Sequence, residues 1–257
     1  MRKTRLSTSI ILMFVFCIMA CGGRGFFAWG EASWKEEVLL HDGSKIIIKR
    51  LNNLGGYPTI DSHERQNLDE TVTFTLSGTN KEITWKTDFR DEKPEPNSLN
   101  LLALDIINGI PYIATYPAGC IAYNKWKRPN PPYIFFKYDG NAWKQIPLEE
   151  FPPEISKVNV IVGRPPAELQ KPFYTAEQVD GENNRGNMDE TYKKIIRTSM
   201  KGVGCEELIY DGKIWHDISG LKKQPSLEAC LDLCPKIGIK FEYCPCNRLF
   251  KNTSKDK

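Results

Sequence analysis

Thiol and imidazole side chains are the groups with the widest chemistry in this 257-residue chain. Thiols can cross-link, bind a metal ion or act as nucleophiles, and imidazoles can act as bases or metal ligands. The chain has eight cysteines but only three histidines, His41, His63 and His216, and no two of the histidines have the spacing of metal ligands. We interpret the histidines as turn or surface residues, so the cysteines carry most of the chemical information.

Motifs for catalysis are absent from the sequence. It has no Gly-x-Ser-x-Gly elbow, no phosphate-binding Gly-Lys-Ser/Thr loop, no His-Glu-x-x-His motif and no EF-hand loop. Adjacent acidic residues, such as Glu149 and Glu150, would face opposite ways on a strand and cannot supply the two converging carboxylates of a glycoside hydrolase. We therefore predict a protein that is not an enzyme and uses neither a cofactor nor a metal ion. A cell-wall hydrolase with scattered carboxylates is the enzymatic alternative.

The N-terminal segment, residues 1–20, has the features of a secretory signal. A basic start precedes an uncharged apolar run that is shorter than the ~20 residues needed to span a bilayer. This run ends in Ile18-Met19-Ala20-Cys21, which resembles the lipobox of bacterial lipoproteins. The resemblance implies cleavage after Ala20, lipidation of Cys21 and a lipidated tether over residues 21–33. Ordinary cleavage after Ala32 and an uncleaved anchor are the alternatives.

The same resemblance implies a location and a membrane partner. In lipoproteins of enteric-type bacteria, an aspartate directly after the acylated cysteine causes retention at the inner membrane, and Gly22 stands at that position here. We therefore expect a lipid-anchored protein on the periplasmic side of the outer membrane. The inner membrane and the cell surface are the alternative locations.

The net charge of +3 belongs entirely to this signal segment. Arg2, Lys3 and Arg5 are its only charged residues, which leaves 32 basic against 32 acidic side chains in the rest of the chain. A nucleic-acid-binding domain normally has a net basic charge or a clustered basic face. We therefore expect no nucleic-acid partner.

Six cysteines remain once Cys17 is removed with the signal and Cys21 carries lipid. Exported proteins fold in an oxidising compartment, so an even number of cysteines predicts disulfides. We expect three bonds among the following residues: Cys120, Cys205, Cys230, Cys234, Cys244 and Cys246.

Two of these cysteines fall on a predicted helix over residues 226–235. Ser226 is a typical N-cap, an acidic first turn follows, and Pro235 is expected to end the helix. Helical spacing places Cys230 and Cys234 on one face, ~6 Å apart along the axis.

Two others fall on a predicted strand over residues 237–246. Alternation would place Cys244 and Cys246 on one side, ~6.6 Å apart. Because the two separations match, we expect two bonds between helix and strand. They are Cys230–Cys244 with Cys234–Cys246, or the crossed arrangement. Elimination leaves Cys120–Cys205 as a long-range bond.

The spacing Cys-x-x-x-Cys…Cys-x-Cys over residues 226–246 resembles the cysteine-stabilised αβ motif of defensin-like domains. The resemblance implies the cross-linked geometry and no activity. A zinc site on the same four thiols is less favoured, because zinc ribbons use Cys-x-x-Cys knuckles and occur in reducing compartments.

Hairpin signals recur along residues 34–162. Tight turns containing Asn-Gly, Asp-Gly or Ser-Gly separate pairs of apolar-rich, extended runs. The predicted strand pairs are 37–40 with 45–49, 71–76 with 82–87, 101–107 with 110–116, and 133–138 with 142–146, followed by a further strand at 158–162. These patterns predict a mainly β fold, with an antiparallel sandwich or barrel-like body built of hairpins.

The remaining chain is divided into two further parts. Residues 163–202 are rich in proline and polar residues and are interpreted as a linker or surface excursion with a short helix at 189–198. Residues 203–257 form a small disulfide-stapled α+β subdomain that starts with a hairpin, 207–210 with 213–216. Tyr-Asp-Gly-x-x-Trp occurs in this hairpin and in the one at 133–146, where a cross-strand aromatic pair is the simplest explanation.

One segment combines the residue types that dominate protein interfaces. Aromatic and cationic side chains alternate with prolines in a connection between strands. The predicted contact residues are Tyr123, Trp126, Lys127, Arg128 and Tyr133. The alternative is a rigid loop whose aromatic rings pack on the sheet.

Together these patterns predict a lipid-anchored envelope protein that acts as a binding or interaction module in the periplasm. The expected partner is a protein or a cell-wall component, beside the membrane that holds the lipid anchor. An immunity or inhibitor protein that neutralises a periplasm-acting toxin is an alternative of the same non-catalytic kind.

Overall fold

The computed structural model describes residues 30–55, 65–76, 78–89, 98–185, 188–202 and 204–251. The predicted signal segment, the lipidation site Cys21 and His63 lie outside the described residues. The predicted tether ends earlier than residue 33, because the first strand already begins at Glu31.

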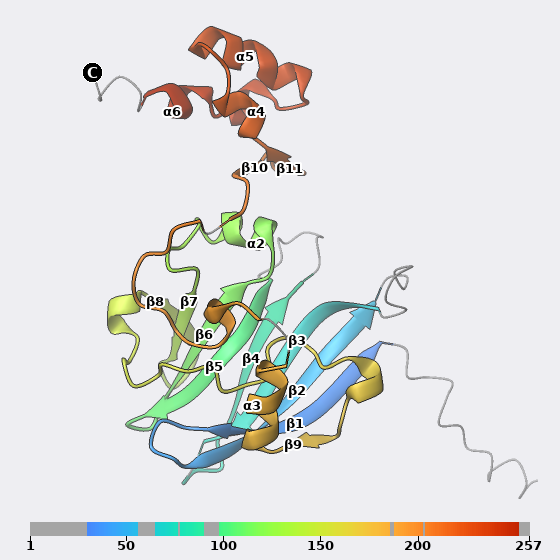
Figure 1. The fold of residues 1–257 in the computed structure, drawn as a ribbon, viewed down its shortest axis with the longest axis vertical. Helices are drawn as coiled ribbons and strands as arrows, with labels where there is room; N and C mark the ends of the chain where they lie inside the picture. The colour runs from blue at the N-terminus through green and yellow to red at the C-terminus, as the bar shows by residue number, and fades with distance from the viewer. Residues whose placement is uncertain are drawn as a thin grey trace, which may run out of the picture.

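The first sheet contains five strands in the order β4-β3-β2-β1-β9 (Figure 1). Its four long strands are antiparallel and alternate buried and exposed side chains, as expected of a sheet with one face on the core. The short β9 pairs parallel with β1. The bounds are β1 Glu31–Leu39, β2 Lys45–Gly55, β3 Gln66–Thr75, β4 Glu82–Asp88 and β9 Phe173–Tyr174.

The second sheet is an antiparallel meander in the order β5-β6-β7-β8. Its first hairpin turns at Asn108 and Gly109, which both adopt positive φ, as tight hairpin turns require. The bounds are β5 Leu99–Ile107, β6 Ile110–Pro117, β7 Ile134–Tyr138 and β8 Trp143–Ile146. All four hairpins predicted from the turn signals are therefore present.

The two sheets pack face to face around one apolar core. Val38, Ile48 and Val72 of the first sheet meet Leu101, Leu104 and Ile113 of the second. At one edge, the indole Nε1 of Trp143 in β8 donates a 2.8 Å hydrogen bond to the Thr84 carbonyl in β4. The described strands form an open sandwich and do not close into a barrel. The predicted mainly β, antiparallel body is confirmed.

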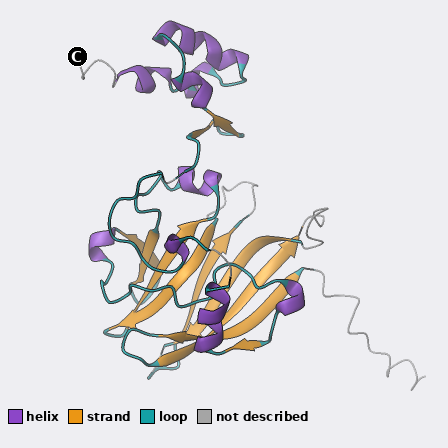
Figure 2. Cartoon of the chain, viewed as in Figure 1, coloured by secondary structure: helices purple, strands orange, loops and turns teal. Residues whose placement is uncertain are grey.

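The outer face of the second sheet is covered by parts of residues 147–200, which contain little regular structure (Figure 2). Ile161, Tyr174 and Val179 of the same stretch pack on Trp34 of the first sheet. Phe151, Ile155 and Ile195 of this covering segment pack on β5, β6 and β7. Its short helices are η1 Leu148–Glu150, η2 Ala167–Leu169, α3 Ala176–Asn183 and η3 Glu190–Tyr192.

Two expectations for this region are wrong. Residues 158–162 form no strand; Val160 and Ile161 are buried because a loop presses them against the sandwich. The expected helix at 189–198 is limited to the single turn η3, and the longer α3 lies in the stretch interpreted as polar linker. The described part of 163–202 lies on the body, where Tyr174, Val179 and Ile195 are buried, so it is arranged as a surface excursion rather than a free linker.

The C-terminal subdomain follows a narrow connection near α2, Cys120–Lys125 (Figure 1). Its hairpin and helices are β10 Leu208–Tyr210, β11 Trp215–Asp217, α4 Ser219–Lys222, α5 Leu227–Lys236, η4 Phe241–Tyr243 and α6 Cys246–Lys251. Ser226 caps α5 as predicted, and Pro235 lies inside its last turn.

The strand expected at 237–246 is wrong, because the cysteines there lie between η4 and the start of α6. The two Tyr-Asp-Gly-x-x-Trp sequences form the same turn. Their tyrosine and tryptophan rings lie 5.3 Å apart in both hairpins, which confirms the cross-strand aromatic interpretation.

Candidate binding site and its surroundings

A cavity of about 620 Å³ opens where the sandwich meets its covering segment. The end of β1 and the turn after it form one wall, loop 154–159 forms the second, and the start of α3 forms the third. Asp105 reaches the cavity from β5. Segments far apart in sequence therefore form this site, and a concave surface of this size is the usual form of a ligand site.

His41 and Asp105 form a hydrogen-bonded pair in the cavity. The Nδ1 of His41 lies 2.8 Å from Oδ1 of Asp105, and the backbone N–H of His41 donates to Oδ2 at 2.9 Å. The Asp105 carboxylate is buried and also accepts the N–H of Ile106 at 2.7 Å. Its hydrogen bond to the imidazole raises the pKa of His41 above the usual value of 6.5.

Asn159 fixes the loop that forms the second wall. Its Nδ2 donates to the carbonyls of Leu39 (3.0 Å) and Leu104 (2.9 Å), and its Oδ1 accepts the Leu104 N–H at 3.0 Å. One side chain thus ties loop 154–159 to both sheets. The side chain itself also lines the cavity, so the wall is held by the sandwich rather than by the loop alone.

The start of α3 is held against β1 by charge-assisted hydrogen bonds. The N–H of Ala176 donates to Glu37 at 3.0 Å, and this bond lowers the pKa of the Glu37 carboxyl. Lys45 bridges Glu37 and Glu177 at 3.0 and 3.1 Å. The backbone N–H of Glu177 and the Thr175 hydroxyl are the main reasons that the pKa of the Glu177 carboxyl falls to about 2.

The ionisable side chains around the cavity have a surplus of negative charge. His41 and Lys157 face four carboxylates, those of Asp105, Glu154, Glu177 and Asp180. Asp105 is paired with His41 and Glu177 with Lys45, whereas no hydrogen bond or ion pair within the described residues engages the carboxylates of Glu154 and Asp180. Apolar groups, among them Leu40, Ile155 and Val158, complete the lining. The lining therefore combines a surplus of negative charge with apolar surface.

A second, smaller charged network is closed to solvent. Arg50 is fully buried, donates to Glu36 at 2.9 Å and to Glu70, and also donates to the Ile161 carbonyl at 3.0 Å. Its guanidinium lies 5.0 Å from the Trp34 ring centroid. Burial raises the pKa of the Glu36 carboxyl in spite of the arginine. Because it is enclosed, this network has a structural role.

The predicted contact surface is largely internal, which corrects the sequence interpretation. Tyr123 and Tyr133 are buried, and the Tyr133 hydroxyl donates to the Lys194 carbonyl at 3.0 Å. Trp126 packs edge-on against Phe136 with ring centroids 6.2 Å apart. Lys127 is exposed and has a positive φ of 62°. The aromatic rings pack on the sheet, as the alternative interpretation expected.

Arg128 and its neighbours hold the connection to the C-terminal subdomain. The guanidinium donates to the carbonyls of Cys205 (2.8 Å) and Glu206 (3.2 Å), while Asn124 accepts the N–H of Leu208 at 2.9 Å. The disulfide Cys120–Cys205, predicted by elimination, lies beside these contacts with its Cα atoms 5.3 Å apart. One of the two cations of the predicted surface, Arg128, therefore binds the protein's own backbone.

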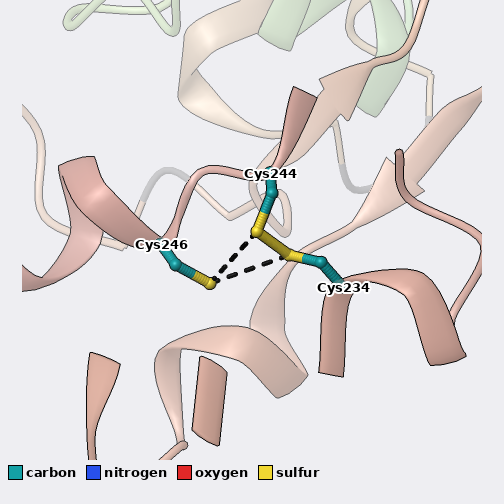
Figure 3. A group of neighbouring side chains, drawn as sticks. All are labelled: Cys234, Cys244 and Cys246. Carbon is teal, nitrogen blue, oxygen red and sulfur yellow. Dashed lines mark hydrogen bonds between the residues drawn. A yellow bond between two sulfur atoms is a disulfide. The ribbon is translucent and has the colours of Figure 1, made fainter. Parts of the chain in front are cut away.

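The other four cysteines form the crossed arrangement, Cys230–Cys246 and Cys234–Cys244. Figure 3 shows three of them, with the sulfur atom of Cys246 beside the Cys234–Cys244 bond. The Sγ of Cys246 lies 3.4 Å from that of Cys244 and 3.7 Å from that of Cys234. The three disulfides expected from the sequence are thus confirmed.

Sequence reasoning missed the cavity and the His41–Asp105 pair. His41 was interpreted as a turn residue, which its position after β1 confirms, but 64 residues separate it from Asp105. The pairing depends on how the two sheets stack, which no local pattern encodes. His216 is likewise paired, at 2.8 Å from Asp211 in its own hairpin.

No protein-family model matches the chain, and no curated protein and no solved structure shows significant similarity to it. Among the described residues, the helices are too short and too polar to cross a membrane.

Proposed function

We propose that this protein is a bacterial envelope lipoprotein, anchored through Cys21, whose β body is a non-catalytic binding module. The observation that carries the binding role is the acidic, partly apolar cavity between the sandwich and its covering segment. Its proposed occupant is a basic peptide segment of a partner protein, in which a lysine or arginine side chain supplies the cation on an apolar stem.

The geometry supports binding because the cavity walls are fixed before a ligand arrives. Asn159 bonds to both sheets, and α3 is attached to β1 through Glu37. Preformed walls lower the entropy cost of association. The carboxylates of Glu154 and Asp180 are available to an incoming cation, whereas Asp105 already binds His41.

A site-specific photo-crosslinker tests the location of the interface in the native envelope. Leu39 lines the cavity and is 47% exposed, and Ile214, in the hairpin of the C-terminal subdomain, is 54% exposed. We expect a crosslinker at Leu39 to capture one protein partner and a crosslinker at Ile214 to capture none. Equal capture at both positions, or capture of cell-wall fragments at Leu39 alone, would contradict the proposed occupant.

Charge removal tests the chemistry of recognition. Glu154→Gln with Asp180→Asn should reduce partner capture at Leu39 at least several-fold, because both free carboxylates of the cavity are neutralised. The matched control is Glu149→Gln with Glu228→Gln, which neutralises two exposed carboxylates elsewhere. Unchanged capture by the cavity variant would show that its charge plays no part.

The lipid anchor is tested separately. The residues Ile18-Met19-Ala20-Cys21 support it, and β1 begins at Glu31, so the tether from residue 22 to residue 30 spans at most ~30 Å. A labelled fatty acid should be incorporated into the wild-type chain and not into Cys21→Ser. We propose an outer-membrane, periplasm-facing location, which sucrose-gradient separation of the two membranes would check. Continued labelling of the serine variant would refute the anchor and leave the cavity result intact.

A further inference from the structure

Three of the four cysteines of the C-terminal subdomain lie closer together than two separate cross-links require. The sulfur atoms of Cys234, Cys244 and Cys246 all lie within 4.8 Å of one another (Figure 3). Cys230 is bonded to Cys246. Disulfide formation explains the two bonded contacts. Disulfide formation does not require contact between the two disulfides. Here the sulfur atoms of Cys244 and Cys246, which belong to different disulfides, lie 3.4 Å apart.

Two of the non-bonded distances between these sulfur atoms are close to those in a tetrahedral metal centre. Zinc–thiolate bonds are ~2.3 Å long, so the edges of a tetrahedral four-sulfur site are ~3.8 Å. The non-bonded distances of 3.7 and 3.4 Å are already near this value. The bonded partners have Cα separations of 5.8 and 5.9 Å, which leave room for their sulfur atoms to move apart by side-chain rotation.

The backbone presents the four side chains from two segments. Cys230 and Cys234 are one turn apart on α5, and both are buried. Cys244 and Cys246 flank Pro245 between η4 and α6. The Ile239 N–H donates to the Cys234 carbonyl at 2.9 Å and holds the returning chain on the end of α5.

The subdomain also depends on these sulfur atoms for its core. Its buried residues are Ile218, Leu221 and Ile239 together with three of the four cysteines. So small a core needs a cross-link or a metal ion to stay folded. When the disulfides are opened, four thiols converge in an apolar centre, and a metal ion that binds them would replace the lost cross-links.

We propose that this cluster is a redox-gated zinc site: the subdomain is held by two disulfides when oxidised and by one Zn²⁺ bound to Cys230, Cys234, Cys244 and Cys246 when reduced. Each disulfide takes two electrons and two protons from a dithiol reductant, which becomes a disulfide. The four thiols then bind Zn²⁺ and release four protons. The proposal is independent of the cavity and its partner.

The test uses the full chain in detergent, reduced with a phosphine in the presence of Zn²⁺, desalted without oxygen, and analysed for bound metal. We expect about one zinc per reduced chain and none per oxidised chain. The matched control, Cys120→Ser with Cys205→Ser, removes two thiols and should retain one zinc. Cys234→Ser with Cys246→Ser should retain none. With Co²⁺ in place of Zn²⁺, the reduced wild type and the control should show the absorption bands of tetrahedral thiolate coordination.

Two readouts separate a folded site from loose binding by an unfolded chain. Helical circular dichroism and protease resistance of the C-terminal subdomain should fall on reduction and recover when Zn²⁺ is added. Absence of zinc from the reduced wild type would overturn the proposal. So would equal zinc retention by the Cys234→Ser, Cys246→Ser variant, or zinc retention without recovery of structure.

Discussion

At the scale of single residues, the arginine buried inside the sandwich has the strictest requirement for charged and polar partners. Arg50 is enclosed by two carboxylates, a carbonyl of the covering segment and the Trp34 ring. A buried ion pair adds little stability relative to an apolar replacement, but one partner left alone is costly. The network therefore fixes the position of the covering segment more than it adds net stability.

Replacement of Arg50 by methionine should lower the free energy of unfolding by about 3–5 kcal/mol, because two buried carboxylates lose their counterion. Urea denaturation measures this loss. Lys35→Met, on the exposed face of the same sheet, is the matched control and should change stability by less than about 0.5 kcal/mol. A triple replacement of Glu36, Arg50 and Glu70 by apolar residues should be less destabilised than Arg50→Met. If the single replacement were harmless, the charges would have no structural role.

Protonation of His41 should depend on its carboxylate partner. An NMR titration should give a His41 pKa above 6.5 in the wild type, and Asp105→Asn should return it toward 6.5. A raised folded-state pKa stabilises the fold below the unfolded pKa, and this contribution is lost as the pH rises through the folded pKa. The stability gap between wild type and Asp105→Asn should therefore be widest below pH 6.5. A gap that widens with rising pH would contradict the assignment.

At the scale of elements, the covering segment behaves as a third layer. It has little regular structure, yet Phe151, Ile155 and Ile195 fill the outer face of the second sheet. Arg197 donates to the Phe151 and Pro152 carbonyls at 2.7 Å, so the turns of the segment are also bonded to each other. Two walls of the candidate site depend on this layer.

Two phenylalanines of the covering segment provide a matched comparison. Phe151 is 1% exposed and its ring centroid lies 4.3 Å from that of Phe135, whereas Phe173 is 38% exposed. Phe151→Ala should cost about 3–5 kcal/mol of unfolding free energy through lost burial and a cavity. Phe173→Ala should cost less than half as much. Equal costs in thermal or chemical denaturation would mean that the segment is loosely attached.

The hairpins could be predicted because their signals are local. Asn108-Gly109 and the other tight turns lie between apolar runs, and strand pairing across them follows from the chain itself. The strand predicted at 158–162 is wrong because that prediction also rested on a local signal, an apolar run. Its apolar residues are buried by contact with a sheet formed elsewhere, and local periodicity cannot distinguish that from a strand.

The candidate site could not be predicted because its groups come from distant parts of the chain. The sequence predicts two possible arrangements of the disulfides in the C-terminal subdomain. Which one forms depends on the path of the chain at η4, where a turn replaces the expected strand. Arg128 was predicted as a surface contact, since its type suits an interface. The carbonyls that accept its hydrogen bonds belong to Cys205 and Glu206, about 80 residues later in the sequence. Only folding brings these groups close to Arg128.

At the scale of the whole molecule, the body and the C-terminal subdomain meet through one narrow connection (Figure 1). The Cys120–Cys205 bond spans 85 residues, and Arg128 and Asn124 hold the backbone beside it. The subdomain has its own core and its own two disulfides. The connection therefore sets its position relative to the cavity-bearing body.

Removal of this long-range bond by Cys120→Ser with Cys205→Ser should lower the free energy of unfolding by about 4–5 kcal/mol in the chain-entropy model. Chemical denaturation under non-reducing conditions measures the loss. Hydrogen exchange should also increase in β10 while remaining slow in β2 and β3, because the connection loosens before the sandwich does. Uniform acceleration over the whole chain would contradict this separation.

The same bond determines what a single proteolytic cut can do. A nick anywhere between residues 120 and 205, including the whole covering segment, leaves two polypeptides joined by one covalent link. The nicked protein would keep its full mass on a non-reducing gel and separate into two fragments only after reduction. A nick between residues 206 and 229 lies beyond the last cross-link to the body and would leave the remaining C-terminal piece without a covalent link to it.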